Sequence, residues 1–198
     1  MAKIIYTNKV DNQISSLPDV NKITASDVNE IKESVNNLYD LKGGWADYAD
    51  ATTSVTPISL TQNVWTDLTN DKAGADTITI YKPSFVTGDL WNSTSNSVDF
   101  SEIGVGKVLM VRNDFEVTAG AANTRLDARL YFPDSGKSIE FKHDNIAING
   151  VLVRYSSTTQ ISTKQSELAS GCKIQIKVNK TGCTAAVENI LITVLSLF

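Results

Sequence analysis

The sequence predicts an all-β fold, an antiparallel jelly-roll sandwich, preceded by an extended N-terminal arm and one short coiled-coil helix. Segments that alternate apolar and polar residues recur after residue 45 and are separated by turn sequences. No helical period of useful length occurs there. Ser, Thr and Asn supply 55 of the 198 residues, which suits a chain with many strands and turns. We therefore expect an arm at residues 1–22, a helix at 23–44 and a head domain at 45–198.

The composition argues against two classes of partner. The net charge is −4, and acidic groups outnumber basic ones in both residues 1–44 and residues 45–198. Non-specific binding to nucleic acid needs clustered Lys and Arg, so no nucleic-acid partner is expected. The longest apolar stretch, residues 190–198, is far shorter than the roughly 20 residues of a membrane-spanning helix. Residues 1–6 lack the apolar core of a signal peptide. We expect neither membrane insertion nor secretion.

Residues 1–22 show no sustained period and are rich in Asn and Ser. Two interpretations stay open: a mobile terminus, or an extended arm that becomes ordered on a partner. In the second, the apolar side chains available as anchors are Ile4, Ile5, Tyr6, Ile14 and Leu17.

The predicted helix begins near Thr24, where Thr24 and Asp27 form a variant of the capping box, and it ends at Gly43-Gly44. Its apolar residues follow the a/d pattern of a coiled coil; they are Val28, Ile31, Val35 and Leu38. The apolar seam is narrower than the face that a helix usually presents to a globular core. Two heptads are too short to be stable alone. The helix therefore needs copies of itself held side by side, or packing on its own domain.

Alternation predicts eight or nine strands in the head. They are expected at residues 54–60, 64–68, 76–83, 107–117, 125–132, 138–142, 150–156 and 172–178, with a closing strand near 190. In the segment 107–117, Leu109, Val111, Phe115 and Val117 share one face. In 125–132, Leu126, Ala128, Leu130 and Phe132 share one face, and Arg125, Asp127, Arg129 and Tyr131 share the other. Eight or so antiparallel strands in this length favour a jelly roll.

The closing strand is apolar on both faces. Ile190, Ile192, Val194 and Phe198 lie on one side, and Leu191, Leu195 and Leu197 lie on the other. A solvated antiparallel strand has one polar face, so this strand needs cover on both. The second cover is either a long loop of the same chain or a neighbouring subunit. The coiled-coil seam upstream favours the subunit.

Candidate catalytic and metal-binding groups do not combine into a site. His143, beside Asp144 in an expected polar turn, lacks the partners of a catalytic triad. Cys172, Cys183 and His143 are fewer than the four ligands of zinc. Asp71 and Asp76 do not have the spacing of a calcium-binding EF-hand loop. We expect no enzyme activity and no cofactor.

Three further local interpretations depend on turns and faces. "GVGK" at 104–107 lacks the phosphate-loop pattern and is expected to be a turn. If "NKTG" at 179–182 joins two paired strands, Val178 faces Cys183, and Cys172 is too far along to form a disulfide with it. The polar face of 125–132 could bind a carbohydrate or an acidic partner, but a charge ladder within the sheet is favoured.

Two segments resemble structural proteins of tailed bacteriophages. "LPDVNKITASDVNEIK" (17–32) resembles a recurring N-terminal segment that leads into a short helix. "FSEIGVGKVLMVRNDFEVTAGAANTRLDARLYF" (100–132) looks like the strand pair of small jelly-roll modules in phage fibres.

The resemblance implies a virion protein, made in the host cytoplasm, with an arm attached to the particle, a short trimeric coil and a TNF-like or C1q-like trimeric jelly roll. The expected function is that of a non-enzymatic homotrimeric head fibre or spike bound to phage capsid proteins, with a host-surface glycan as a further partner. The alternative is a tail-fibre or baseplate receptor-binding protein, and a third hypothesis is a glycan-active enzyme. The number three comes from the resemblance, because the a and d residues do not distinguish dimers from trimers.

Overall fold

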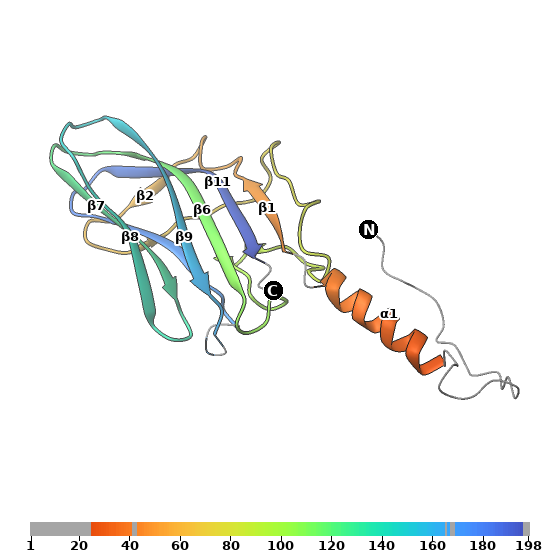
Figure 1. The fold of residues 1–198 in the computed structure, drawn as a ribbon. Helices are drawn as coiled ribbons and strands as arrows, with labels where there is room; N and C mark the ends of the chain where they lie inside the picture. Colours follow the sequence, from red (N-terminus) through yellow and green to blue (C-terminus); the bar gives the residue numbers. More distant parts are fainter. Residues whose placement is uncertain (1–24, 41–42, 165, 167–168, 196–198) are drawn as a thin grey trace, which may run out of the picture. The chain divides into compact units, whose positions relative to one another are not determined.

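The computed structural model describes residues 25–40, 43–164, 166 and 169–195. The chain divides into two compact units between residues 42 and 43. The first contains the helix α1 (Ala25–Asp40), and the second contains all the strands (Figure 1). Within the described residues, no helix has the length and apolar character needed to cross a bilayer.

The helix α1 carries the predicted seam on its surface. Ile31 is 60% exposed and Val35 is 39% exposed, while Val28 is half-buried. The side chain of Leu38, Thr24 of the expected cap, and all five predicted anchors of the arm lie outside the residues described. The described part of the seam is thus open to solvent in a single chain.

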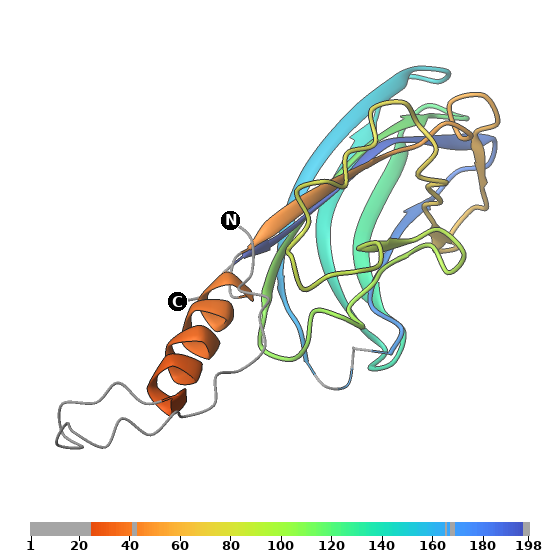
Figure 2. The ribbon, with the colours of Figure 1, turned by 90° about the vertical axis from the view of Figure 1, so that its right-hand side faces the viewer.

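The second unit is a sandwich of two antiparallel sheets (Figures 1 and 2). Sheet I has the order β1-β11-β6-β9, and β2 also pairs with β11; sheet II has the order β3-β10-β7-β8. The strands of sheet I are β1 (Gly44–Ala49), β2 (Ile58–Leu60), β6 (Val108–Thr118), β9 (Leu152–Ser162) and β11 (Cys183–Leu195). Those of sheet II are β3 (Thr66–Asp67), β7 (Thr124–Phe132), β8 (Lys137–Ile146) and β10 (Lys173–Val178). A separate two-stranded ribbon pairs β4 (Trp91–Asn92) with β5 (Ser97–Val98).

The chain alternates between the sheets as a jelly roll does. From β6 in sheet I it passes to β7 and β8 in sheet II, returns to β9 in sheet I, and then crosses to β10 and back to β11. The predicted fold class is confirmed. The expected pairing across "NKTG" is wrong, because β10 and β11 belong to different sheets: Val178 pairs with Leu126, and Cys183 pairs with Leu60.

Most of the predicted strands are present, and residues 76–83 are an exception. The long alternating segments form β6, β7, β8, β9, β10 and β11. Residues 76–83, also predicted to be a strand, make only an isolated bridge between Ile78 and Asp47. Ile80, on the expected apolar face, is 81% exposed. Alternation alone does not make a strand where no neighbouring strand offers a full ladder of hydrogen bonds.

The strand β1 was not predicted from the sequence. It pairs with β11 at one edge of sheet I. Its first residue, Gly44, approaches the backbone of residue 81 so closely that a Cβ atom would collide with the Tyr81 carbonyl oxygen. The N–H of Trp45 donates to that same carbonyl at 2.9 Å. The glycine pair expected only to end the helix therefore also starts a strand.

The core lies between the two sheets and follows the predicted faces. Leu109, Val111, Phe115 and Val117 of β6 are each at most 1% exposed. The inward residues of β7, predicted as one apolar face, are also buried; they are Leu126, Ala128, Leu130 and Phe132. Burying a side chain of this size contributes roughly 1.5–3 kcal/mol. The outer faces of the two sheets and the connecting segments are therefore the surfaces exposed to a partner.

Candidate functional site

The C-terminal part of β11 carries apolar side chains on both faces, with Thr193 as the one polar residue on its outer side. Ile190, Ile192 and Val194 point into the core and are at most 2% exposed. Leu191 and Leu195 lie on the outer face of sheet I and are half-buried, while Leu197 lies outside the residues described. No loop of the described chain covers these two leucines completely.

Other apolar side chains share this part of the outer face. The register places Trp45 and Met110 on either side of Thr193, and Val108 beside Leu195. Met110 is 36% exposed, and the Trp45 ring stacks on Tyr81 with centroids 4.9 Å apart. We call Trp45, Val108, Met110, Leu191 and Leu195 the apolar end of sheet I.

Two groups of ion pairs also lie on this face. Arg112 lies 3.0 Å from Asp114 and 3.7 Å from Asp47. Arg154 lies 2.5 Å from Glu116 and 3.6 Å from Glu188. Partial burial raises the pKa of Glu188, and the neighbouring Glu116 and Asp114 carboxylates add to this, whereas Arg154 opposes it. The face combines an apolar end with paired charges, a composition common in interfaces between subunits.

The outer face of sheet II carries the predicted charge ladder, and the structure confirms its placement on β7. Asp127, whose side chain is 7% exposed, is its centre. Arg125 lies 3.0 Å from one oxygen of this carboxylate, His143 Nδ1 lies 2.8 Å from the same oxygen, and Lys177 lies 3.5 Å from the other. Burial acts to raise the pKa of Asp127, but hydrogen bonds from His143 and Arg125 and the two positive charges hold it below its usual value.

The sequence analysis expected His143 in a turn, and this prediction is wrong. His143 lies on the strand β8, opposite Asp127. Its Nε2 lies 3.1 Å from Glu140. The ring is thus held between two carboxylates of its own sheet, and no serine, threonine or cysteine side chain is bonded to it among the described residues. His143 thereby extends the charged cluster around Asp127 from β7 to β8.

A second cluster on sheet II joins Arg129 and Tyr131, which the sequence placed on this face, with Trp65 and Gln175, which it did not. The guanidinium carbon of Arg129 lies 4.1 Å from the ring centroid of Trp65 and 4.8 Å from that of Tyr131. Two guanidinium nitrogens, Nε and Nη2, donate to Gln175 Oε1 at 2.9 and 2.8 Å. Lys177 Nζ also lies 4.4 Å from the Trp65 centroid. We call Trp65, Arg129, Tyr131 and Gln175 the arginine stack.

The sequence pattern that could have placed Trp65 in this cluster covers only the two residues of β3. Trp65 directly precedes β3, where Thr66 pairs with Ile176, so Trp65 comes opposite Lys177. Predicting the contact required knowing that β3 lies beside β10, and two paired residues are too few for a sequence pattern to show this.

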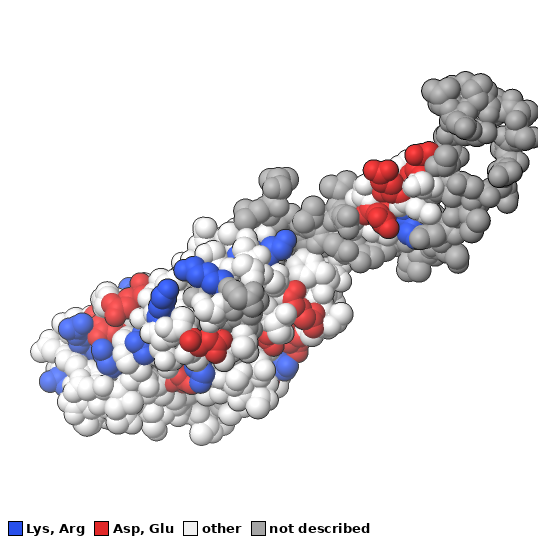
Figure 3. Space-filling view, turned by 90° about the horizontal axis from the view of Figure 1, so that it is seen from below, with Lys and Arg blue, Asp and Glu red and all other residues white. Residues whose placement is uncertain are grey.

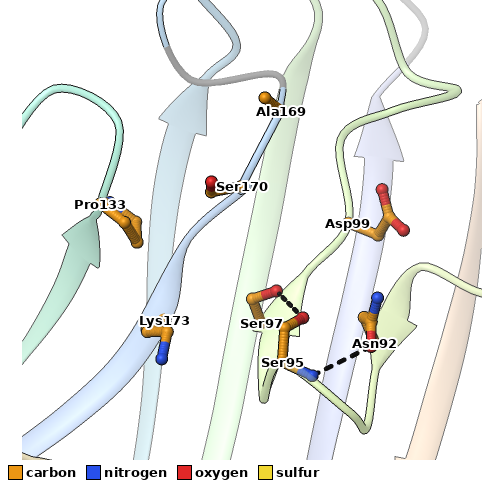
Figure 4. Close-up of a pocket in the computed structure, with 8 residues that line it drawn as sticks. All are labelled: Asn92, Ser95, Ser97, Asp99, Pro133, Ala169, Ser170 and Lys173. Carbon is orange, nitrogen blue, oxygen red and sulfur yellow. Dashed lines mark hydrogen bonds between the residues drawn. The ribbon is translucent and has the colours of Figure 1, made fainter.

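A pocket of about 310 Å³ opens where β7 ends and β10 begins (Figure 4). The β4–β5 turn contributes Asn92, Ser95 and Ser97, and the segment before β10 contributes Ser170 and Lys173. The Ser95 and Ser97 hydroxyls lie 2.7 Å apart, and Ser95 N donates to Asn92 Oδ1. The left-handed conformation of Asn96, with φ of 51°, reverses the chain and brings both serines to the pocket wall.

Metal and thiol chemistry receive no support from the part of the chain that is described. It contains no group of three or more His, Cys, Asp or Glu side chains placed to hold a metal. Asp71 accepts hydrogen bonds from the backbone of Ala51 and Ala73. Cys172 and Cys183 are buried and not joined by a disulfide. Gly104 and Gly106 take positive φ values in the turn predicted at 104–107.

Charges of both signs are interleaved over the face of the sandwich seen in Figure 3. No broad surface of one sign appears in that view. On that face, recognition of a charged ligand would therefore depend on individual groups rather than on a general field.

Comparisons with known proteins give a distant likeness only. No family model and no curated protein sequence matches the chain. Among solved structures it is similar to PRD1 vertex protein P5, with 13% identity, a TM-score of 0.39, and coverage of 77% of this chain and 70% of that one.

Two further solved structures are similar to it. For murine APRIL the identity is 10% and the TM-score 0.44, over 78% of this chain and 100% of that one. For Eiger TNF from S. frugiperda the identity is 10% and the TM-score 0.41, over 79% and 94%. At these values no conclusion about function follows from the likeness.

Proposed function

We propose that this protein is a non-enzymatic structural component of a bacteriophage virion, a homotrimeric fibre or spike on the head. Residues 1–22 attach it to the capsid, and the sandwich projects outward and adheres to host-surface glycans. The observation that carries the proposal is that a single chain leaves two apolar surfaces open, one on the helix and one on the sandwich.

The helix supports self-association because two apolar side chains of its seam are exposed in a single chain and would be buried between copies. Ile31 and Val35 are 60% and 39% exposed. A 16-residue helix of ordinary composition is marginal alone in water. Copies held together by a trimeric head would meet at high effective concentration, and their seams would then bury one another.

The apolar end of sheet I supports the same conclusion independently. Leu191 and Leu195 lie on the outer side of an interior strand of the sheet, between β1 and β6. Symmetric contact between copies through this surface would supply the second cover that the strand requires. The charged groups around it, such as Arg112 and Asp114, would form the polar rim.

Assignment to a virion is supported by the resemblance of residues 17–32 and 100–132 to phage structural proteins. Its test is the labelling of intact particles with an antibody against residues 45–198. We expect label on the heads of virions of the phage that encodes the chain. Label at the tail tip would favour the receptor-binding alternative, and unlabelled virions would contradict the proposal.

The role of the arm has a separate test. Deletion of residues 2–22 should abolish incorporation into particles and leave the mass of the purified oligomer unchanged apart from the residues removed. Incorporation of the truncated chain at the normal level would show that the arm is not the attachment segment.

The helix seam can be tested with a matched pair of substitutions. Val35→Lys places a charge in the seam, and Val55→Lys makes the same change at a residue that is 82% exposed on the sandwich. We expect Val35→Lys to reduce the helical circular dichroism signal of the oligomer, because the seams can no longer pack, and Val55→Lys to leave it unchanged. Equal signals from both variants would contradict packing of the seam.

A further inference from the structure

The guanidinium of Arg129 differs from the other cations on the outer face of sheet II. Lys173 lies 2.5 Å from Asp67, and Arg125 and Lys177 both contact Asp127. Among the described residues, no carboxylate lies within ion-pair distance of Arg129. Glu140, its register partner, is instead 3.1 Å from His143.

The arginine stack holds this cation in place. Trp65 and Tyr131 contact the guanidinium plane, and Gln175 accepts from two of its nitrogens while its own Nε2 donates to Asp67 Oδ1 at 2.7 Å. Five N–H groups radiate from a guanidinium, so several remain for a ligand. A planar fork fixed by aromatic rings loses little entropy when it binds a carboxylate.

A hydroxyl-rich pocket adjoins this cation. Lys173 lines the pocket of Figure 4, and its register partner is Tyr131 of the arginine stack. Lys173 and Gln175 are successive outward residues of β10. Lys173 lines the pocket, and Gln175 pairs with Arg129 on β7.

The Ser170 hydroxyl donates to Asp134 at 2.7 Å and can accept from a ligand, and the Asp99 carboxylate in the lining can accept as well. Ser95, Ser97 and the amide of Asn92 can donate and accept. This mixture matches the hydroxyl groups of a sugar. The pocket volume of about 310 Å³ suits a small polar unit.

From these observations we propose that the outer face of sheet II binds a polysaccharide of hexuronic acids. Arg129 binds the carboxylate of one sugar unit, and the pocket lined by Ser95, Ser97 and Ser170 receives the hydroxyls of a neighbouring unit. This proposal names the class of glycan for the adhesion proposed above. Its role in adhesion rests on the proposed function, display of the chain on a phage particle. The binding itself is a property of the purified protein.

The test is calorimetric titration of the full chain with oligogalacturonate and with oligomannuronate, each beside its methyl ester. We expect at least one of the free acids to bind and its ester, which has the same hydroxyls without the charge, to bind at least tenfold more weakly. Absence of binding by both free acids would overturn the proposal. Equal affinity for acid and ester would overturn the role of the carboxylate.

Two variants locate the site. Arg129→Gln should weaken binding of the free acid about tenfold or more, since a hydrogen bond to a charged group is lost. Arg125→Gln, on the same face of the same strand but already paired with Asp127, should change the affinity less than about twofold. Equal loss in both variants would mean general attraction by positive charge and would overturn the assignment to Arg129.

A measurement on the unmodified protein covers the case in which Arg129→Gln does not fold. The chain contains three tryptophans, Trp45, Trp65 and Trp91. With 5-fluorotryptophan incorporated, titration should shift the fluorine resonance of Trp65 and leave that of the fully buried Trp91 in place. An unshifted Trp65 resonance at saturation would overturn the site. Oligomer mass and particle labelling do not depend on these results, so failure here is distinguishable from failure of the proposed function.

Discussion

The hydroxyl of Tyr48 on β1 accepts a hydrogen bond of 2.6 Å from the backbone N–H of Leu90, which lies just before β4. Both residues are buried, at 0% and 1% exposed. Asn70 joins them, because its side chain donates to the Tyr48 carbonyl at 2.7 Å and its carbonyl accepts from the Trp91 indole at 2.8 Å. This network attaches the long irregular segment between β3 and β4 to sheet I.

Tyr48→Phe should destabilise the fold by about 1–3 kcal/mol, because the Leu90 N–H would be left buried without its acceptor. Burial raises the pKa of Tyr48 to about 12, so the effect should be the same from pH 6 to pH 9. Equilibrium unfolding in urea measures it.

Tyr155 provides the matched control. Its side chain is 6% exposed, and its hydroxyl lies near the Asp144 carboxylate but makes no hydrogen bond of good geometry. Tyr155→Phe should therefore cost less than Tyr48→Phe, because no buried backbone N–H loses its acceptor. Comparable destabilisation by both substitutions would contradict the assignment of the Tyr48 network.

The carboxylate of Asp127 should make the stability of the head depend on pH in the acid range. Its folded pKa is lower than the ordinary value of 3.8, so its contribution is fully present above that value and is lost as the pH falls through the folded pKa. Asp127→Asn should therefore cost about 1–3 kcal/mol at pH 6. The difference from the unchanged protein should begin to decrease only below pH 3.8, and it should be lost once the pH is below the folded pKa of Asp127.

Urea unfolding from pH 2 to pH 7 gives this difference directly. The groups that face Asp127 are His143, Arg125 and Lys177. A difference between the two proteins that stays constant down to pH 2 would show that the charge of Asp127 is not responsible.

Gly44 should tolerate no side chain. Gly44→Ala places a Cβ against the Tyr81 carbonyl, which is backbone and cannot move aside without breaking its bond with Trp45. We expect a loss of about 1–3 kcal/mol in the stability of the head. Gly43→Ala, at the neighbouring exposed residue, should have little effect. The thermal unfolding midpoints of the two variants should therefore differ, and equal midpoints would show that the close approach is not required.

The sequence was sufficient where a strand is long and one face is buried. The alternation of Leu109, Val111, Phe115 and Val117 recurs as a buried face because period-two burial determines the register. The same rule placed Arg125, Asp127, Arg129 and Tyr131 together on the outside of β7, and it separated Ile192 from Leu191 on β11.

The sequence was insufficient where position depends on distant neighbours. Residues 76–83 alternate, but their backbone contacts with β1 amount to one bridge, between Ile78 and Asp47, and one further hydrogen bond, from Trp45 to Tyr81, so no strand forms. The loop at 179–182 resembles a hairpin turn, yet β10 and β11 pair with other strands in different sheets. The arginine stack joins Trp65 with Arg129 and Gln175 through the two-residue strand β3, which is too short to give a pattern.

The most direct test of self-association is the mass of the full chain in solution by multi-angle light scattering, for the unchanged protein and for Leu191→Lys. We expect three times the chain mass of 21.5 kDa for the unchanged protein. We expect a shift toward 21.5 kDa for Leu191→Lys, whose new charge lies in the apolar end of sheet I. Ile148→Lys, a control at a residue 65% exposed in the loop before β9, should keep the larger mass. A mass of 21.5 kDa for the unchanged protein would contradict the account.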